Sequence, residues 1–198
     1  MPKISDETRA LRRAQILEAA WRCFYRNGVQ ATTMEEIIEE AGMSASAMYR
    51  YFANKEDIIV NAIRTSLGGL KALLTPIFAE ATETSPAAFV GKVTGTIDAF
   101  TARQGYNLSS IAIHGWSEAQ RNEAIRSIIR DFYLEFRAML AGQVRRWQAC
   151  GHLPAAADVR SVADTLLSVM LGYVVQAAVM RDASPRAHVE GLDALAGR

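Results

Sequence analysis

One short stretch of the sequence carries side chains suited to contact with DNA. Small residues fill positions 44–47, and Tyr49, Arg50 and Tyr51 follow them. Small side chains let a helix approach a DNA groove closely, and tyrosine hydroxyls can donate hydrogen bonds to phosphate oxygens. Lys55 can bring its charge to a second phosphate. An ordinary helical hairpin with two surface tyrosines has the same spacing, so geometry alone leaves both interpretations open.

The charge pattern allows a positive surface here although the chain as a whole is almost neutral. The formal net charge is +1. Four glutamates lie within residues 35–40, whereas residues 41–55 contain Arg50 and Lys55 and no acidic residue. Such segregation can produce a positive patch without a basic domain.

The neighbouring residues predict the short helices that would position these side chains. Thr33 and Glu36 have the spacing of a capping box, which predicts a helix start. Gly42 predicts its end, and Ser44 can cap a second helix. Residues 33–52 therefore have the layout of a helix-turn-helix.

The rest of the chain predicts an all-α fold. A helix ending at Asn27-Gly28 precedes the motif, and an apolar face of helical period runs from Lys55 to Phe78. Similar faces recur further along, whereas Tyr106–Trp116 is less regular. These patterns predict an N-terminal domain over residues 1–54, with the helix-turn-helix, and a helical domain over residues 55–198.

Two segments near the C-terminus predict contact with a second copy of the chain. Asp158–Met180 is apolar around most of its helical circumference, which predicts burial on nearly all sides, and Pro185–Leu195 would form a short final helix. The most apolar part, Leu166–Met180, covers about three-quarters of the ~20 residues of a membrane span. We therefore expect a homodimer without a membrane segment, and the absence of a leader-like start favours the cytoplasm.

The helix-turn-helix region resembles the DNA-binding segment of the TetR family of bacterial transcriptional regulators. The resemblance extends over about residues 11–63 and is most specific in the run from Met48 to Ile58, Met-Tyr-Arg-Tyr-Phe-Ala-Asn-Lys-Glu-Asp-Ile. It implies a homodimer with a three-helix DNA-binding head and a helical body for ligand binding and dimerisation.

The resemblance also implies roles for individual residues. Thr33, Tyr49, Tyr51 and Lys55 would contact phosphates of double-stranded operator DNA. The side chains facing the bases would be those of Ser44, Ala45, Ser46, Ala47 and Arg50. Where the family often has Lys-Gly-Thr, this chain has Ala-Ser-Ala at 45–47, so direct hydrogen-bond readout depends on Ser46 and Arg50.

Basic residues near the N-terminus have two interpretations. Arg9, Arg12 and Arg13 can form an arm that reaches the DNA, or a solvated, frayed terminus. Arg22 and Arg26 are spaced four residues apart behind Glu18, and an exposed salt-bridge stripe explains them better.

Large apolar residues of the body can line a cavity for a small, mostly apolar or aromatic effector, although most of them are expected to be core. Asn107 and His114 are the candidate polar anchors, each with a structural role as the alternative. The apolar candidates are Phe78, Phe100, Trp116, Phe132, Phe136, Met139, Met170 and Tyr173.

Enzyme motifs are absent from the sequence. It contains no Gly-x-Ser-x-Gly, no phosphate-binding glycine-rich loop and no His-Glu-x-x-His, which predicts no catalytic residues, no metal and no cofactor. The sequence therefore predicts a repressor that a small ligand releases from its operator. The alternatives are an all-helical enzyme and a purely structural dimerisation module.

Overall fold

The computed structural model describes residues 5–80, 85–103 and 105–196 and confirms the predicted all-α class. The elements are α1 (Asp6–Asn27), α2 (Met34–Glu40), α3 (Ala45–Met48), α4 (Lys55–Glu80), α5 (Pro86–Thr101), α6 (Leu108–Glu118), α7 (Glu123–Ala149), α8 (Val159–Val175), a π-helical turn η1 (Gln176–Met180) and α9 (Pro185–Leu195). Two antiparallel two-residue strands, β1 (Ala102–Arg103) and β2 (Tyr106–Asn107), connect α5 to α6.

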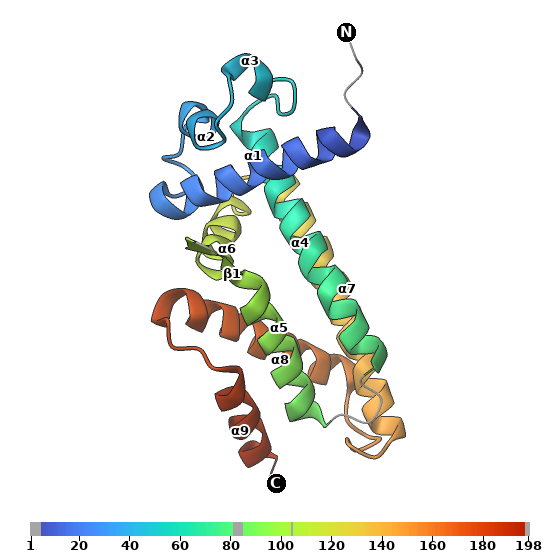
Figure 1. The fold of residues 1–198 in the computed structure, drawn as a ribbon. Helices are drawn as coiled ribbons and strands as arrows, with labels where there is room; N and C mark the ends of the chain where they lie inside the picture. The colour runs from blue at the N-terminus through green and yellow to red at the C-terminus, as the bar shows by residue number, and fades with distance from the viewer. Residues whose placement is uncertain (1–4, 81–84, 104, 197–198) are drawn as a thin grey trace.

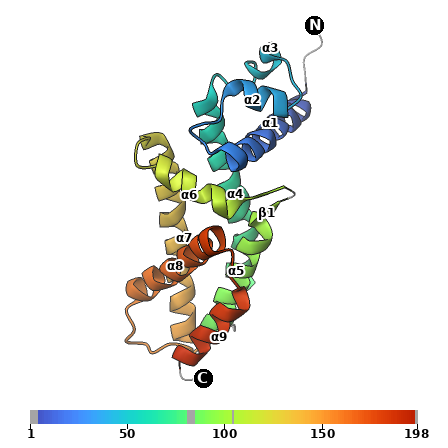
Figure 2. The same ribbon diagram turned by 90° about the vertical axis from the view of Figure 1, so that its left-hand side faces the viewer.

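The helices form a small head at one end of an elongated body. The head, defined as α1–α3, lies at the end of the molecule opposite the C-terminus (Figure 1). Helices α4 and α7 run along each other from the head toward the far end of the body, where α5, α8 and α9 pack (Figures 1 and 2). A displacement at one end of α4 is therefore transmitted along a single helix.

The apolar core of the head continues into the body. Ile16, Cys23 and Phe24 of α1 are fully buried, and they belong to one cluster with Ile58 of α4 and Ile111 of α6. The predicted boundary between residues 54 and 55 stays a prediction, but the first turns of α4 contribute side chains to the core of the head. The head and the upper body thus share one core.

Two polar contacts reinforce this junction. The Tyr106 hydroxyl donates to Glu18 Oε1 at 2.9 Å, and burial raises the pKa of the phenol, which keeps it a donor. The Gln30 amide donates to Glu118 Oε1 at 2.6 Å. Both bonds join the head to the segment that contains β2 and α6.

A second core fills the far end of the body. Phe89 packs edge-to-face against Phe78 and Trp147, with ring centroids 5.1 and 5.3 Å apart. Tyr173 of α8 is fully buried and donates a hydrogen bond to Asp98 of α5 at 2.9 Å. This cluster fixes α8 to the α4, α5 and α7 layer.

The prediction of a less regular segment at Tyr106–Trp116 is wrong. The segment begins with β2 and continues as α6, an ordinary helix through Glu118. Asn107 caps it, because its side-chain oxygen accepts a hydrogen bond from the Ser109 amide at 2.7 Å. Small residues along α6 weaken its apolar period. The capping residue Asn107 was therefore the only sequence signal of a helix in this segment.

The long apolar segment after Asp158 differs from its prediction in two ways. It changes to the π-helical turn η1 at Gln176, and Arg181, with a left-handed backbone at φ 56°, ends it. In the single chain it is not buried on nearly all sides, since Val179 and Met180 are more than 60% exposed.

Length and apolar composition also place two segments within the range of a membrane span. In the described part of the chain, Lys55–Glu80 and Val159–Met180 are long and apolar enough, with 22 residues in the second. Core helices of soluble proteins satisfy the same criterion, so the finding is weak. The second segment was expected to be too short because only its most apolar part, Leu166–Met180, was counted.

Ion pairs hold α1 against α2 on the surface of the head. Arg22 Nε lies 2.6 Å from one Glu40 oxygen, and Arg26 Nη1 lies 2.7 Å from the other. Arg22 is 3.8 Å from Glu18, so the expected stripe along α1 is the weaker contact. The hydrogen bonds from both guanidinium groups lower the pKa of the Glu40 carboxyl.

Replacing Glu40 with Gln should destabilise the head in a pH-dependent way. Because folding lowers the pKa of Glu40, its stabilisation is present above the unfolded-state pKa and is lost as the pH falls through the folded-state value. At neutral pH we expect a loss of about 0.5–1 kcal/mol in urea unfolding, which shrinks toward zero in acid. Glu39→Gln, at an exposed neighbouring position, is the control. A loss of equal size at acidic pH would contradict the assignment.

Candidate DNA-binding surface and ligand cavity

The predicted helix-turn-helix is present, and its local hydrogen bonds explain why it forms. The Thr33 hydroxyl accepts from the Glu36 amide at 3.2 Å, and Glu36 accepts from the Thr33 amide at 2.7 Å, which completes the capping box. Gly42 adopts φ 63° after α2, a conformation that glycine tolerates best. Ser44 then caps α3 through the Ala47 amide at 3.3 Å.

Two buried side chains orient α3 on the head. Met48 and Phe52 are almost completely buried in the core that the head shares with α4. Because they fix one side of this short helical segment, the opposite side faces solvent. The same anchoring holds the turn after Met48, in which the amide of Tyr51 donates to the Met48 carbonyl at 2.9 Å.

The solvent-facing side of α3 presents the side chains that the sequence assigns to DNA. Tyr49 and Arg50 are exposed, and neither side chain makes a hydrogen bond or ion pair within the described residues. Tyr51 is half-buried. The small residues of the segment are Ser44, Ala45 and Ser46, which are exposed, and Ala47, which is partly buried. Most of the proposed base-facing residues are therefore exposed to solvent. Thr33, expected at a phosphate, lies at the start of α2.

Lys55 makes contacts within the protein that the sequence did not predict. Its Nζ donates to the carbonyl oxygens of Val29, Gln30 and Thr32 at 3.2, 2.9 and 2.7 Å. An ammonium group has three N–H donors, so these bonds use all of them. The lysine therefore ties the start of α4 to the loop after α1 rather than offering a free donor to a phosphate.

The basic residues near the N-terminus do not form an arm. Arg9, Arg12 and Arg13 all lie within α1, which begins at Asp6. Arg13 donates to the Tyr51 carbonyl at 2.8 Å, and its guanidinium lies 4.2 Å from the centroid of the Phe52 ring. It therefore supports the turn after α3. Capping by Ser5, whose hydroxyl accepts from the Thr8 amide, explains the early helix start.

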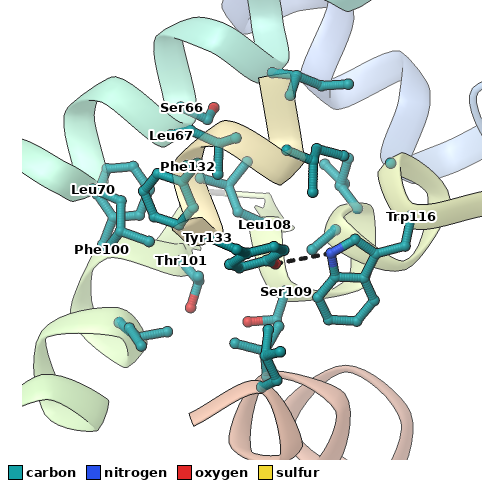
Figure 3. A pocket seen from close by; sticks show the side chains of 18 of the residues that line it. Ser66, Leu67, Leu70, Phe100, Thr101, Leu108, Ser109, Trp116, Phe132 and Tyr133 are labelled. Atoms are coloured by element: carbon teal, nitrogen blue, oxygen red, sulfur yellow. Dashed lines mark hydrogen bonds between the residues drawn. The ribbon is translucent and has the colours of Figure 1, made fainter. Parts of the chain in front are cut away.

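A largely apolar cavity of about 140 Å³ lies below the head, between α4, α5, α6, α7 and α8 (Figure 3). Trp21 and Phe24 of α1 also line it. The cavity therefore borders the core that the head and body share. A concave, apolar site with few polar groups is the usual form of a small-molecule pocket.

Half of the predicted ligand residues line this cavity. They are the aromatic and sulfur-containing side chains Phe100, Trp116, Phe132, Phe136 and Met170. They come from four different helices. Phe136 and Met170 are buried, whereas Phe100, Trp116 and Phe132 are partly buried at the edge of the cavity.

The other predicted ligand residues lie outside the lining of this cavity. Phe78 and Tyr173 are buried in the far core, and Met139 lies beside α4 outside the cavity. Asn107 caps α6, and His114 is exposed. Periodicity shows which residues are buried, but it cannot show which buried residues border an empty space.

The polar lining residues Tyr133 and Ser109 are among those that the sequence did not predict. The Trp116 indole donates to the Tyr133 hydroxyl at 2.9 Å, and burial raises the pKa of Tyr133 to about 12. Ser109 is 1% exposed, and its Oγ has no hydrogen-bond partner in the part of the chain described. Tyr133 could have been found from its helical spacing, four residues after Ile129 and three before Phe136, whereas the sequence gives no signal for Ser109.

The charges around the cavity are few. Glu118 is the one acidic residue among the described lining residues, which include no Lys or Arg. One oxygen of Glu118 accepts the bond from Gln30 of the head. The described residues also contain no group of three or more His, Cys, Asp or Glu placed to hold a metal ion.

Comparisons with known proteins agree for both parts of the chain. A family profile described as bacterial regulatory proteins, tetR family, matches residues 16–62. A second, described as BetI-type transcriptional repressor, C-terminal, matches residues 96–195, half of the chain. The helix-turn-helix thus falls in the first matched region, whereas the cavity is lined by residues of both regions and by the part of α4 between them.

Individual relatives extend over most of the chain. The probable HTH-type transcriptional regulator ArpR of Pseudomonas putida is 30% identical over 168 residues, 82% of this chain and 78% of the relative. BetI of Rhizobium meliloti is 27% identical over 181 residues, 89% and 81% of the two chains. A further relative is 41% identical over 73 residues, 36% of each chain.

A solved structure gives the same result for the fold. Salmonella enterica GusR aligns with a TM-score of 0.73 and 25% identity over 98% of both chains. Together, the profiles, the relatives and the exposed α3 surface show a DNA-binding transcriptional regulator. The chain belongs to the TetR family.

Proposed function

We propose that the protein is a homodimeric repressor that leaves its operator when a small, mostly apolar ligand enters the cavity. TetR-family regulators bind operator DNA and small-molecule effectors. One observation carries the proposal for this chain: the cavity is bordered by α1 of the head as well as by the body. A ligand there contacts both parts of the molecule at once.

The proposed DNA contacts follow from the exposed side of α3. Ser44–Ala47 and Arg50 face the bases, and Thr33, Tyr49 and Tyr51 face phosphates. The role assigned to Arg50 is the most specific of these, since arginine can donate two hydrogen bonds to guanine. Lys55 is left out, because its ammonium group is occupied within the head. It supports the surface without contacting DNA directly.

A second copy of the chain is proposed to cover α8, η1 and α9. Exposed apolar side chains lie along these elements, and the largest are Val175, Val179, Met180 and Leu195. Such a row is unfavourable in water and is typical of an interface between copies. The dimer would set the distance between two α3 segments so that both reach successive major-groove faces.

Ligand binding can release DNA only if the ligand prefers one arrangement of the heads over another. Helix α4 is the connecting element, because its first turns belong to the head core and its middle lines the cavity. We place the protein in the cytoplasm, without a membrane segment and without a catalytic role. The buried thiol of Cys23 in the head agrees with the absence of a catalytic role, because burial raises its pKa and makes the reactive thiolate rarer.

Replacing Arg50 or Tyr49 should separate base contacts from phosphate contacts. In gel shifts with the upstream region of the protein's own gene, Arg50→Ala should weaken binding and blur base preference, by about 1–3 kcal/mol at the contacted base pair. Tyr49→Phe should weaken binding to all sequences alike.

Arg145→Ala, an exposed arginine at the far end of α7, is the matched control and should bind normally. Wild-type binding should fall steeply as salt rises, since phosphate contacts release counterions. Unchanged affinity in both head variants, or binding insensitive to salt, would exclude this surface.

Charge placed on the proposed dimer surface should separate the copies. Val179→Glu should yield monomers in light scattering at micromolar concentration, because it would bury an unpaired carboxylate between the subunits. Leu134→Glu, at a similarly exposed apolar position on α7, should remain dimeric. A dimer that survives Val179→Glu but dissociates with Leu134→Glu would place the interface elsewhere.

A further inference from the structure

The cavity contains one buried hydroxyl that the protein itself does not satisfy. Ser109 is 1% exposed, and its Oγ is the one buried side-chain polar atom without a partner among the described residues. Leaving such a group unpaired costs about 1–3 kcal/mol, and native structures pair almost all of them. A hydroxyl kept in this state next to an empty space points to a partner that enters the space.

Other buried hydroxyls show that pairing within a helix is the normal solution here. Thr94, also buried, donates to the Val90 carbonyl at 2.8 Å, and Thr101 of the cavity donates to the Asp98 carbonyl at 3.1 Å. Ser109 stands near the start of α6, where the chain four residues earlier is a turn rather than helix. No carbonyl of a preceding helical turn is therefore available to the Ser109 hydroxyl, and Ser109 lines the cavity.

Tyr133 supplies a second donor to the same space. Its hydroxyl oxygen accepts the bond from Trp116, and no acceptor for its own proton lies among the described residues. Burial raises the pKa of the phenol to about 12, so the proton stays in place at neutral pH. Figure 3 shows Thr101, Ser109 and Tyr133 around the same space, with the Trp116 bond holding the tyrosine.

The remaining lining restricts the ligand by size and charge. The volume of about 140 Å³ is close to that of an engineered apolar cavity of about 150 Å³ that binds benzene. An anion would find no Lys or Arg among the described lining residues, and the one carboxylate among them, Glu118, would repel it. A neutral compound with one aromatic ring matches both restrictions.

We propose that the cavity binds a neutral, single-ring aromatic compound bearing a carbonyl or similar oxygen acceptor, and that this oxygen receives a hydrogen bond from Ser109 Oγ. Tyr133 is the second donor to the same oxygen or to a neighbouring one. The inference rests on the proposed ligand-responsive function and names its ligand class. It assigns to α6 the residue that recognises the ligand.

Calorimetric titration of the full-length protein with matched probes tests this assignment without DNA. Acetophenone carries the acceptor, isopropylbenzene has nearly the same shape without it, and benzoate and phenyltrimethylammonium carry opposite charges. We expect acetophenone to bind about three- to tenfold more tightly than isopropylbenzene. Ser109→Ala should abolish this preference, and Tyr133→Phe should reduce it. Ser117→Ala, on the exposed side of α6, should leave it unchanged.

A second readout needs no ligand. Because Ser109→Ala removes an unsatisfied hydroxyl, the melting temperature of the free protein should stay the same or rise. A clear decrease would show that the hydroxyl already has a partner in the protein and would overturn the proposal. The measurement also shows directly whether the variant is folded.

The outcomes separate this inference from the proposed function. Equal affinity for the ketone and the hydrocarbon, tighter binding of either charged probe, or no binding of any probe would overturn the ligand class, even if another compound releases the protein from DNA. Ketone binding that depends on Ser109 supports the class. If that binding leaves the gel shift unchanged, the site assignment stands and the proposed release mechanism fails.

Discussion

The structure depends on one apolar core that passes from the head into the body. Phe24 of α1 and Ile111 of α6 lie in the same cluster, together with the first turns of α4. Apolar burial is the dominant favourable term in folding, so the head gains stability from side chains outside its own three helices. Its position is therefore set by how α6 and α4 pack beneath it.

This shared core explains why a cavity in the body can affect a surface that reads DNA. The cavity borders α1, α4 and α6, the three elements that meet at the junction. Close-packed cores accommodate added volume by discrete shifts of whole elements rather than by gradual deformation. The polar bonds Tyr106–Glu18 and Gln30–Glu118 hold that junction in one arrangement.

The sequence predicted the features that local interactions determine. It did not predict the features that depend on tertiary packing. The helix-turn-helix was predictable because Thr33, Glu36 and Ser44 act over three residues. The internal contacts of Lys55 were not predictable, since its carbonyl partners lie 23–26 residues away in the sequence. Half of the predicted ligand residues line the cavity and half do not, because helical period reports burial and not the position of a cavity. Ser109 has no sequence signature, because it stands out only by the missing hydrogen-bond partner of its hydroxyl among the described residues.

Hydrogen–deuterium exchange of Ile111→Ala tests the shared core most directly. Ile111 belongs to α6, outside the head, and is 3% exposed. If the core is continuous, the cavity left by this substitution should cost about 2–5 kcal/mol and lower the protection of amides in α1 and α4 as well as in α6. Loss of protection confined to α6, with the head exchanging as in the wild type, would contradict the account.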